Sequence, residues 1–289
     1  MLMIVKMIDK SNLIPEILLT ASFSFKNLAI ATGVVSALGL LIGLFLGLAS
    51  KTLAVQVDET EEKVRGLLPG VNCGGCGYAG CDACAKAIAT GEAAADVCPV
   101  ASRDIHVEIA ELMGGSVEAS EKEVAYVNCA GSCDKAKKRS NYNGPKDCKL
   151  ANGIDGNGSK GCSYGCMGFG SCVKVCLFDA MHIVDGIAYV DKEKCTACGM
   201  CVDECPINII EMVPARARTL VACSSLDKGK DVKAVCSIGC IGCRLCVKAC
   251  AYDAIHVEDN LAKIDYDKCT NCGECVKVCP VKVIQQQTA

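Results

Sequence analysis

The chain has 289 residues, of which 26 are cysteine, whereas tryptophan is absent. The cysteines fall in tight runs, and neighbours that close are hard to join as disulfides because disulfide geometry is demanding. Their spacing suits a multivalent metal centre, and so many thiols indicate a reducing compartment. The formal net charge of −3 speaks against nucleic acid as a partner, since nucleic-acid-binding domains are usually basic.

An uncharged apolar run follows an N-terminal extension of residues 1–27. The run covers residues 28–50, and as a helix it would be roughly 34 Å long, enough to cross a hydrocarbon core. A signal peptide is the alternative, but the apolar region of a signal peptide is shorter than this run. The sequence therefore predicts one retained transmembrane helix.

The charges beside this helix do not decide its orientation. Lysine and arginine are equally frequent just before and just after it, so the positive-inside rule is balanced. The thiol-rich remainder favours the cytoplasmic side, where thiols stay reduced. Three glycines recur every four residues and would share one helix face: Gly39, Gly43 and Gly47. Such a stripe lets a second membrane helix approach closely, so it predicts docking against a membrane partner.

A glycine-rich module at residues 51–113 carries the first regular cysteine pattern. Its candidate ligands are Cys73, Cys76, Cys81 and Cys98. The glycines between them let the backbone fold tightly around a bulky centre, and a helix over 82–90 would return Cys98 to the other three. A 4Fe-4S cluster is predicted here, with structural zinc as the alternative. Cys84 is interpreted as a small buried hydrophobic residue.

The rest of the chain contains an internal repeat with an offset of 74 residues. Residues 162–176 align on 236–250, and residues 194–206 align on 268–280. Between the two halves of each copy, apolar and polar residues alternate as in a short β-hairpin. The repeat predicts two tandem ferredoxin-like units, each with two 4Fe-4S clusters.

These segments define the expected organisation. We expect an α+β chain with a single N-terminal transmembrane helix, a small cysteine-rich 4Fe-4S module and two tandem ferredoxin-like units. The first unit covers residues 162–213 and the second covers residues 214–289. A cysteine-containing linker at residues 114–161 precedes them.

The spacing C-x2-C-x2-C-x3-C-P is a strong signal for a 4Fe-4S cluster, and its fourth cysteine binds the other cluster of the pair. In the second unit this rule joins Cys240, Cys243 and Cys246 to Cys279, and it joins Cys269, Cys272 and Cys275 to Cys250. In the first unit it joins Cys195, Cys198 and Cys201 to Cys176.

The remaining set is irregular, because Phe169 stands where Cys243 would align. Its members are Cys166, Cys172 and Cys205, with Cys162 as the nearest candidate for the fourth ligand. A three-iron cluster, or a bond from Cys148, stays open as an alternative.

Five cysteines are left over, and the sequence leaves open whether some of them bind a sixth cluster or are buried thiols. They are Cys129, Cys133, Cys148, Cys223 and Cys236. Five 4Fe-4S clusters are therefore predicted, with six as the upper count. His182 and His256 hold equivalent positions in the repeat, and a structural role is favoured for them over metal binding.

Nucleotide-binding glycine motifs, a P-loop and nucleophilic triads are not visible in the sequence. The sequence therefore predicts a carrier of single electrons that has no complete active site of its own.

Taken in order, three features resemble the B subunit of Rnf complexes, the ion-translocating ferredoxin:NAD+ oxidoreductases. They are the glycine-rich anchor, the segment LPGVNCGGCGYAGC with Cys98, and the ferredoxin motifs. The resemblance is to the extended form with two ferredoxin units. It implies a translocase subunit that takes electrons from soluble ferredoxin and passes them to other membrane subunits of a complex pumping Na+ or H+. It also implies the bacterial cytoplasmic membrane, with the cluster domains on the cytoplasmic side.

Two other interpretations stay open at this point. One is a membrane-anchored polyferredoxin of a hydrogenase or formate-linked complex, in which the first module beside the anchor is not expected. The other is a zinc-binding scaffold, which iron content would exclude. We expect the electron to enter at the second ferredoxin-like unit, which lies farthest from the anchor along the chain.

Overall fold

The computed structural model describes residues 25–52, 58–116, 121–153 and 158–287. It divides into two compact units, with the boundary between Val57 and Asp58. The predicted N-terminal extension lies almost entirely outside the described residues.

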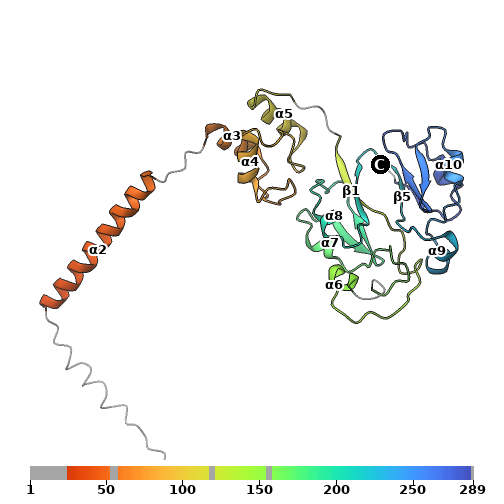
Figure 1. The fold of residues 1–289 in the computed structure, drawn as a ribbon, viewed down its shortest axis with the longest axis horizontal. Coiled ribbons are helices and arrows are strands. Elements are labelled where there is room, and N and C mark those ends of the chain that lie inside the picture. The colour runs from red at the N-terminus through yellow and green to blue at the C-terminus, as the bar shows by residue number, and fades with distance from the viewer. Residues whose placement is uncertain (1–24, 53–57, 117–120, 154–157, 288–289) are drawn as a thin grey trace, which may run out of the picture. The chain divides into compact units, whose positions relative to one another are not determined.

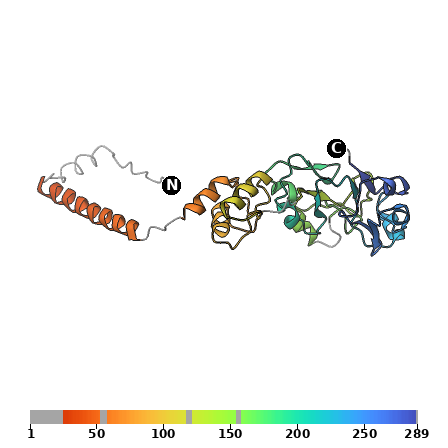
Figure 2. The same ribbon diagram turned by 90° about the horizontal axis from the view of Figure 1, so that it is seen from above.

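The first unit contains helix α2, Phe25–Thr52. Figure 2 shows it as one unbroken helix. Its segment Leu28–Ser50 has a mean hydropathy of 2.3 and is long and apolar enough to cross a membrane. The large apolar side chains of this segment are exposed, so the chain itself provides no core for them among the described residues. The predicted apolar helix is confirmed in extent.

The second unit begins with a small helical module. It comprises α3 (Glu59–Leu67), α4 (Cys81–Ala89) and α5 (Arg103–Leu112). The Asp58 carboxylate caps α3 by accepting a hydrogen bond from the Thr60 N–H at 3.0 Å. Val64, Ile88 and Ile109, one from each helix, are fully buried together. The helix predicted over 82–90 is confirmed as α4.

The predicted hairpins are present at both repeat positions. Strand β2 (Met181–Val184) pairs antiparallel with β3 (Ile187–Val190), and β6 (Ile255–Glu258) pairs with β7 (Leu261–Ile264). The first turn is Asp185-Gly186 and the second is Asp259-Asn260, and all four residues have positive φ. This is the conformation that two-residue hairpin turns favour.

Two further antiparallel pairs join strands that are far apart in the sequence (Figure 1). Strand β1 (Glu123–Val127) pairs with β4 (Ile210–Pro214), and β5 (Thr219–Val221) pairs with β8 (Ile284–Gln286). Strand β1 lies in the segment predicted as a linker. Because β1 pairs with β4, we count β1 and the residues that follow it with the first ferredoxin-like unit.

Short helices contain cysteines or lie beside them. They are α6 (Cys148–Asn152), α7 (Ser171–Lys174), α8 (Met200–Glu204), α9 (Gly229–Val235), α10 (Leu245–Ala249) and α11 (Glu274–Val278). Helices α7 and α8 recur as α10 and α11 with the same offset of 74 residues that relates the hairpins. Four cysteine runs are thus held by equivalent pieces of backbone.

Candidate metal centres

Four cavities in the second unit are each lined by four cysteines, and the four cavities are similar in size. We name each cavity after one of its cysteines: the Cys129, Cys148, Cys195 and Cys269 cavities. Equal numbers of thiols around spaces of similar size indicate one kind of occupant.

The Cys195 and Cys269 cavities bring together two predicted ligand sets. Cys176, Cys195, Cys198 and Cys201 line the first, and Cys250, Cys269, Cys272 and Cys275 line the second. Each cavity also has a backbone N–H bonded to sulfur: Ala180 N–H donates to Cys176 Sγ, and Ala254 N–H donates to Cys250 Sγ, both at 3.4 Å. Such bonds favour a thiolate, because they place a partial positive charge beside the sulfur.

Three of the four cysteines of a third predicted set belong to or contact the core of the second ferredoxin-like unit. Cys240 and Cys246 are buried there, and Cys279 packs against the same core. Burial raises the pKa of Cys246 to about 11, and the nearby charges of Cys240 and Cys243 add to the rise. Cys243 is exposed.

The cavity that contains three cysteines of the irregular set is lined by Cys148, the alternative fourth ligand, and not by Cys162, the one preferred on spacing. Cys148, Cys166, Cys172 and Cys205 line the Cys148 cavity, whereas Cys162 lines the Cys129 cavity. Cys148 is the first residue of α6. The Asp147 carboxylate caps that helix by accepting from the N–H groups of Lys149 and Leu150 at 2.9 and 3.1 Å. The Cys148 N–H donates to Ser171 Oγ at 2.8 Å, which fixes α6 against α7.

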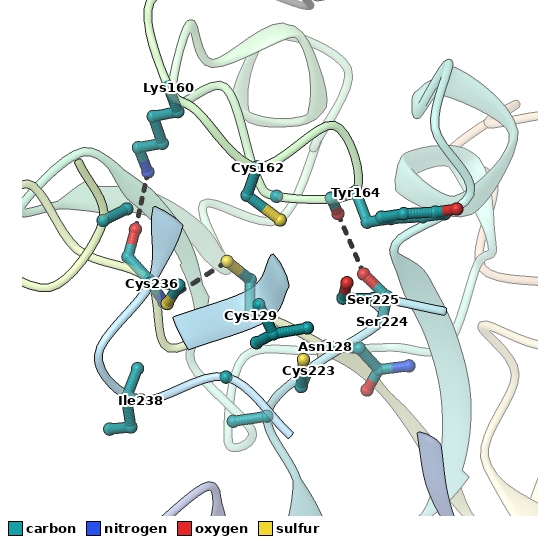
Figure 3. Close-up of a pocket in the computed structure, with 16 residues that line it drawn as sticks. Asn128, Cys129, Lys160, Cys162, Tyr164, Cys223, Ser224, Ser225, Cys236 and Ile238 are labelled. Atoms are coloured by element: carbon teal, nitrogen blue, oxygen red, sulfur yellow. Dashed lines mark hydrogen bonds between the residues drawn. The ribbon is translucent and has the colours of Figure 1, made fainter. Parts of the chain in front are cut away.

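The Cys129 cavity collects cysteines that have no place in the regular ligand sets. Figure 3 shows the side chains of Cys129, Cys162, Cys223 and Cys236 around it. Burial raises the pKa of Cys162, and the charges of Cys129 and Cys236 contribute. Burial also raises the pKa of Cys223 to about 11, although the N–H of Cys240 donates to its sulfur at 3.3 Å.

The four cysteines of this cavity form two pairs of repeat equivalents. Cys162 and Cys236 differ by the repeat offset of 74 residues. Cys129 lies two residues after β1, and Cys223 lies two residues after β5. The backbone beside each is held alike, since Asn128 N–H donates to Ile209 O at 2.8 Å and Ala222 N–H donates to Val283 O at 2.9 Å. The Cys129 cavity therefore lies between the two ferredoxin-like units, and each unit supplies two of its thiols.

Cys133, another cysteine outside the regular sets, lines none of the four cavities. It is exposed, near the turn at Gly186.

The helical module places its four predicted ligands around one end of α4. Cys81 and Cys98 are buried, and Cys73 and Cys76 are partly exposed. Asn72 Oδ1 accepts from the Cys81 N–H at 2.7 Å, and so joins the cysteine loop to the start of the helix. The charges of Cys76 and Cys73 add to the effect of burial in raising the pKa of Cys98, so these thiols are neighbours. Cys84 is 1% exposed, and burial raises its pKa to about 12.

The thiols fit an iron–sulfur cluster better than a single ion. Among the described residues, no three Cys, His, Asp or Glu side chains converge closely enough to bind one metal ion. Burial raises the pKa of Cys172 and of Cys201 to about 12, so a bare thiolate is unfavourable there. A bound cationic iron centre would supply the missing positive charge.

Family models match three parts of the chain. A model described as "Putative Fe-S cluster" matches residues 68–100, one described as "4Fe-4S binding domain" matches residues 188–211, and one described as "4Fe-4S dicluster domain" matches residues 239–283. Together with the cavities, these matches define the class: the chain is an iron–sulfur electron-transfer protein that binds 4Fe-4S clusters.

Similar proteins narrow this class. The chain is 47% identical over 256 residues to the B subunit of the Na+-translocating ferredoxin:NAD+ oxidoreductase complex of Acetobacterium woodii, covering 88% of this chain and 77% of the relative. It is 44% identical to the B subunit of the ion-translocating oxidoreductase complex of Methanosarcina acetivorans, covering 87% and 96%. It is 41% identical to the B subunit of the proton-translocating ferredoxin:NAD+ oxidoreductase complex of Clostridium ljungdahlii, covering 87% and 90%. The chain belongs to the family of B subunits of the Rnf ion-translocating oxidoreductase complexes.

Proposed function

We propose that this chain is the membrane-anchored subunit that accepts electrons from reduced soluble ferredoxin and passes them to partner subunits of an ion-pumping ferredoxin:NAD+ oxidoreductase. The observation that carries the proposal is the presence of four cysteine-lined cavities in one compact unit. This unit follows, in the sequence, an apolar helix of membrane-spanning length. Its relatives are named for ion-translocating complexes, two of them for ferredoxin and NAD+.

The chain would hold six 4Fe-4S clusters. In three ligand sets the fourth cysteine comes from the other motif of the pair. They are Cys176 with Cys195, Cys198 and Cys201; Cys250 with Cys269, Cys272 and Cys275; and Cys240, Cys243 and Cys246 with Cys279. A fourth set is Cys73, Cys76, Cys81 and Cys98. The Cys148 cavity supplies Cys148, Cys166, Cys172 and Cys205 for the fifth, and the Cys129 cavity supplies Cys129, Cys162, Cys223 and Cys236 for the sixth.

When bound, a 4Fe-4S cluster accepts and releases one electron. The protein supplies the ligands, a partly water-excluded pocket and N–H donors to sulfur, which together set the reduction potential. Ala188 N–H donates to Cys166 Sγ and Ala125 N–H to Cys195 Sγ, both at 3.4 Å. These donors come from β3 and β1, so the small sheets position groups that adjust the charge on the ligands.

The membrane part has two proposed roles. Helix α2 would anchor the chain in the bacterial cytoplasmic membrane as a single span, with the cluster domains on the cytoplasmic side. Its stripe of Gly39, Gly43 and Gly47 would pack against a membrane helix of another Rnf subunit. A Cβ at any of these glycines would meet no atom within 4 Å, so no described residue covers this face.

The test uses the full chain, purified anaerobically in detergent and mixed with chemically reduced ferredoxin. Visible absorbance and low-temperature electron paramagnetic resonance follow its clusters. Rapid bleaching with new reduced-cluster signals is the expected result. Clusters that are loaded with iron but stay oxidised would reject ferredoxin as the donor and favour a polyferredoxin of another redox complex. A colourless protein without iron would instead favour the zinc scaffold.

A further inference from the structure

Lys160 is a buried cation without a carboxylate partner among the described residues. It is 6% exposed, and none of the ion pairs of the described part of the chain includes it. Its ammonium donates to Gly131 O at 2.8 Å and to Gly186 O at 2.7 Å. Two neutral carbonyls satisfy donors but do not balance the charge. A buried charge without an opposite charge is strongly unfavourable, so the site calls for an anion.

Two sets of thiols lie near this charge: Lys160 opposes the rise in the pKa of Cys166, which lines the Cys148 cavity, and its own side chain lines the Cys129 cavity. Lys160 lines the Cys129 cavity, as do all four of that cavity's cysteines, and Figure 3 shows its side chain at the edge of the cavity, with the ammonium bonded to a backbone carbonyl. A cluster held by four thiolates is net negative, and it becomes more negative by one charge when it is reduced. A fixed positive charge beside it stabilises the reduced state more than the oxidised state, which raises the reduction potential.

We propose that Lys160 is the counter-charge of a 4Fe-4S cluster bound in the Cys129 cavity and raises the reduction potential of that cluster. This inference rests on the proposed sixth ligand set. The cluster would lie between the two ferredoxin-like units, because each unit contributes two of its ligands. Lys160 would make this junction easier to reduce than the thiolates alone would allow, and so favour passage of an electron from one unit to the other.

The position of Lys160 is fixed by backbone on two sides. Gly131 follows Cys129 by two residues, and Gly186 lies in the turn between β2 and β3. Residue 160 also forms a β-bridge with Lys138. A structural role, in which Lys160 only joins these loops, is therefore the competing explanation. The two roles differ in what replaces the lysine: a structural role needs hydrogen bonds, whereas the counter-charge needs the charge.

The test is a redox titration of the anaerobically purified full chain, followed by electron paramagnetic resonance. Cys236→Ala identifies the signal of the Cys129 cavity by its loss together with about four irons. In Lys160→Gln, which keeps a hydrogen-bond donor but no charge, that signal should show at least a tenfold lower ratio of reduced to oxidised cluster at a fixed potential. For one electron this is a shift of about 59 mV to more negative potential. The signal of the Cys148 cavity, whose Cys166 also senses the charge of Lys160, should move less, and the potentials of the remaining signals should not change.

Lys192→Gln is the matched control. Lys192 also donates to a backbone carbonyl, Ala217 O at 3.0 Å, but it lines none of the four cavities. The Lys192→Gln variant should leave the reduction potential of the Cys129-cavity signal unchanged. Lys160→Arg, which keeps the charge, should retain the potential of the parent chain.

The outcomes separate the two proposals. Full iron in Cys236→Ala would reject the sixth ligand set itself. If Cys236→Ala loses four irons but the reduction potential is unchanged in Lys160→Gln, the sixth ligand set stands and the role of Lys160 as counter-charge is rejected. If Lys160→Gln loses the cluster, retention in Lys160→Arg supports the charge, and loss in both variants indicates a structural role only.

Discussion

At the scale of single residues, Phe169 determines how one metal centre is completed. It occupies the repeat position of Cys243 and has no group that binds iron. Its ring packs on Tyr142 with centroids 5.0 Å apart, so it holds the upstream loop against the first unit. That loop ends in α6, whose first residue, Cys148, lines the cavity that Phe169 leaves one thiol short. In the proposed ligand set, the extra residues between Cys129 and Cys162 would thus supply the missing ligand.

The first prediction tests this exchange of ligands by counting iron. Cys148→Ala and Cys162→Ala should each lose about four irons, because each removes one ligand from a different 4Fe-4S cluster. The double variant should lose about eight. Cys133→Ala is the control, since Cys133 lines no cavity among the four, and it should keep its full iron. A loss of only four irons in the double variant would mean that Cys148 and Cys162 serve the same cluster.

At the scale of secondary-structure elements, β5 joins two cores. Side chains alternate across a strand, so neighbouring residues face opposite sides. Leu220 is fully buried in the core that contains Tyr126 and Val213, whereas Val221 belongs to the core that contains Ile255. The strand therefore packs on the first ferredoxin-like unit through Leu220 and on the second through Val221. The orientation of the two units, and with it the Cys129 cavity, depends on this short strand.

The second prediction concerns Leu220→Ala. Removal of a fully buried leucine side chain should lower the free energy of unfolding by about 2–5 kcal/mol. Anaerobic denaturant titration, followed by the loss of visible absorbance, measures the change. Leu226→Ala is the control, because Leu226 is 42% exposed and its replacement should change stability by less than about 0.5 kcal/mol. Equal midpoints for the two variants would show that β5 does not join the cores.

The third prediction concerns helix α2. Gly43→Leu should reduce co-purification with the other membrane subunits, because a large side chain on the glycine face prevents close approach of another helix. Phe45→Leu is the control, since residue 45 lies about 200° around the helix from residue 43. Co-purification that is equally intact in both variants would remove the glycine stripe as the docking face.

The sequence predicts the local parts of this molecule well and the long-range parts less well. The apolar helix, α4 and both hairpins are encoded by patterns within about twenty residues, and the structure confirms them. The pairing of β1 with β4 spans more than eighty residues, and β1 has no cysteine motif to mark it. Spacing alone favours Cys162 over Cys148, because Cys162 is the nearer cysteine in sequence. The repeat holds the better signal: Cys236 is not needed by its own unit, so its equivalent, Cys162, should also be free for another site.

At the scale of the whole molecule, the helical module and the first ferredoxin-like unit meet at a glycine. A Cβ on Gly75 would lie 2.5 Å from the carbonyl oxygen of Cys198, a contact that real Cβ atoms do not make. The adjacent thiols are also close, since the charge of Cys73 adds to burial in raising the pKa of Cys198. Gly75 and Cys198 thus bring the loops of two proposed clusters into direct contact. An electron path between the module and the ferredoxin-like unit would cross here.

The last prediction tests that path with Gly75→Ala. The added methyl group meets backbone, which does not yield as a flexible side chain would, so the two loops must separate. The cluster of the helical module and the cluster bound by Cys198 should both keep their iron. After mixing with reduced ferredoxin, however, the signal of the cluster in the helical module should appear more slowly, as followed by freeze-quench electron paramagnetic resonance. Gly66→Ala is the control: it is a glycine of α3 whose Cβ would meet nothing within 4 Å, and it should leave the rate unchanged. An unchanged rate in Gly75→Ala, with full iron, would show that electrons reach the module by another route.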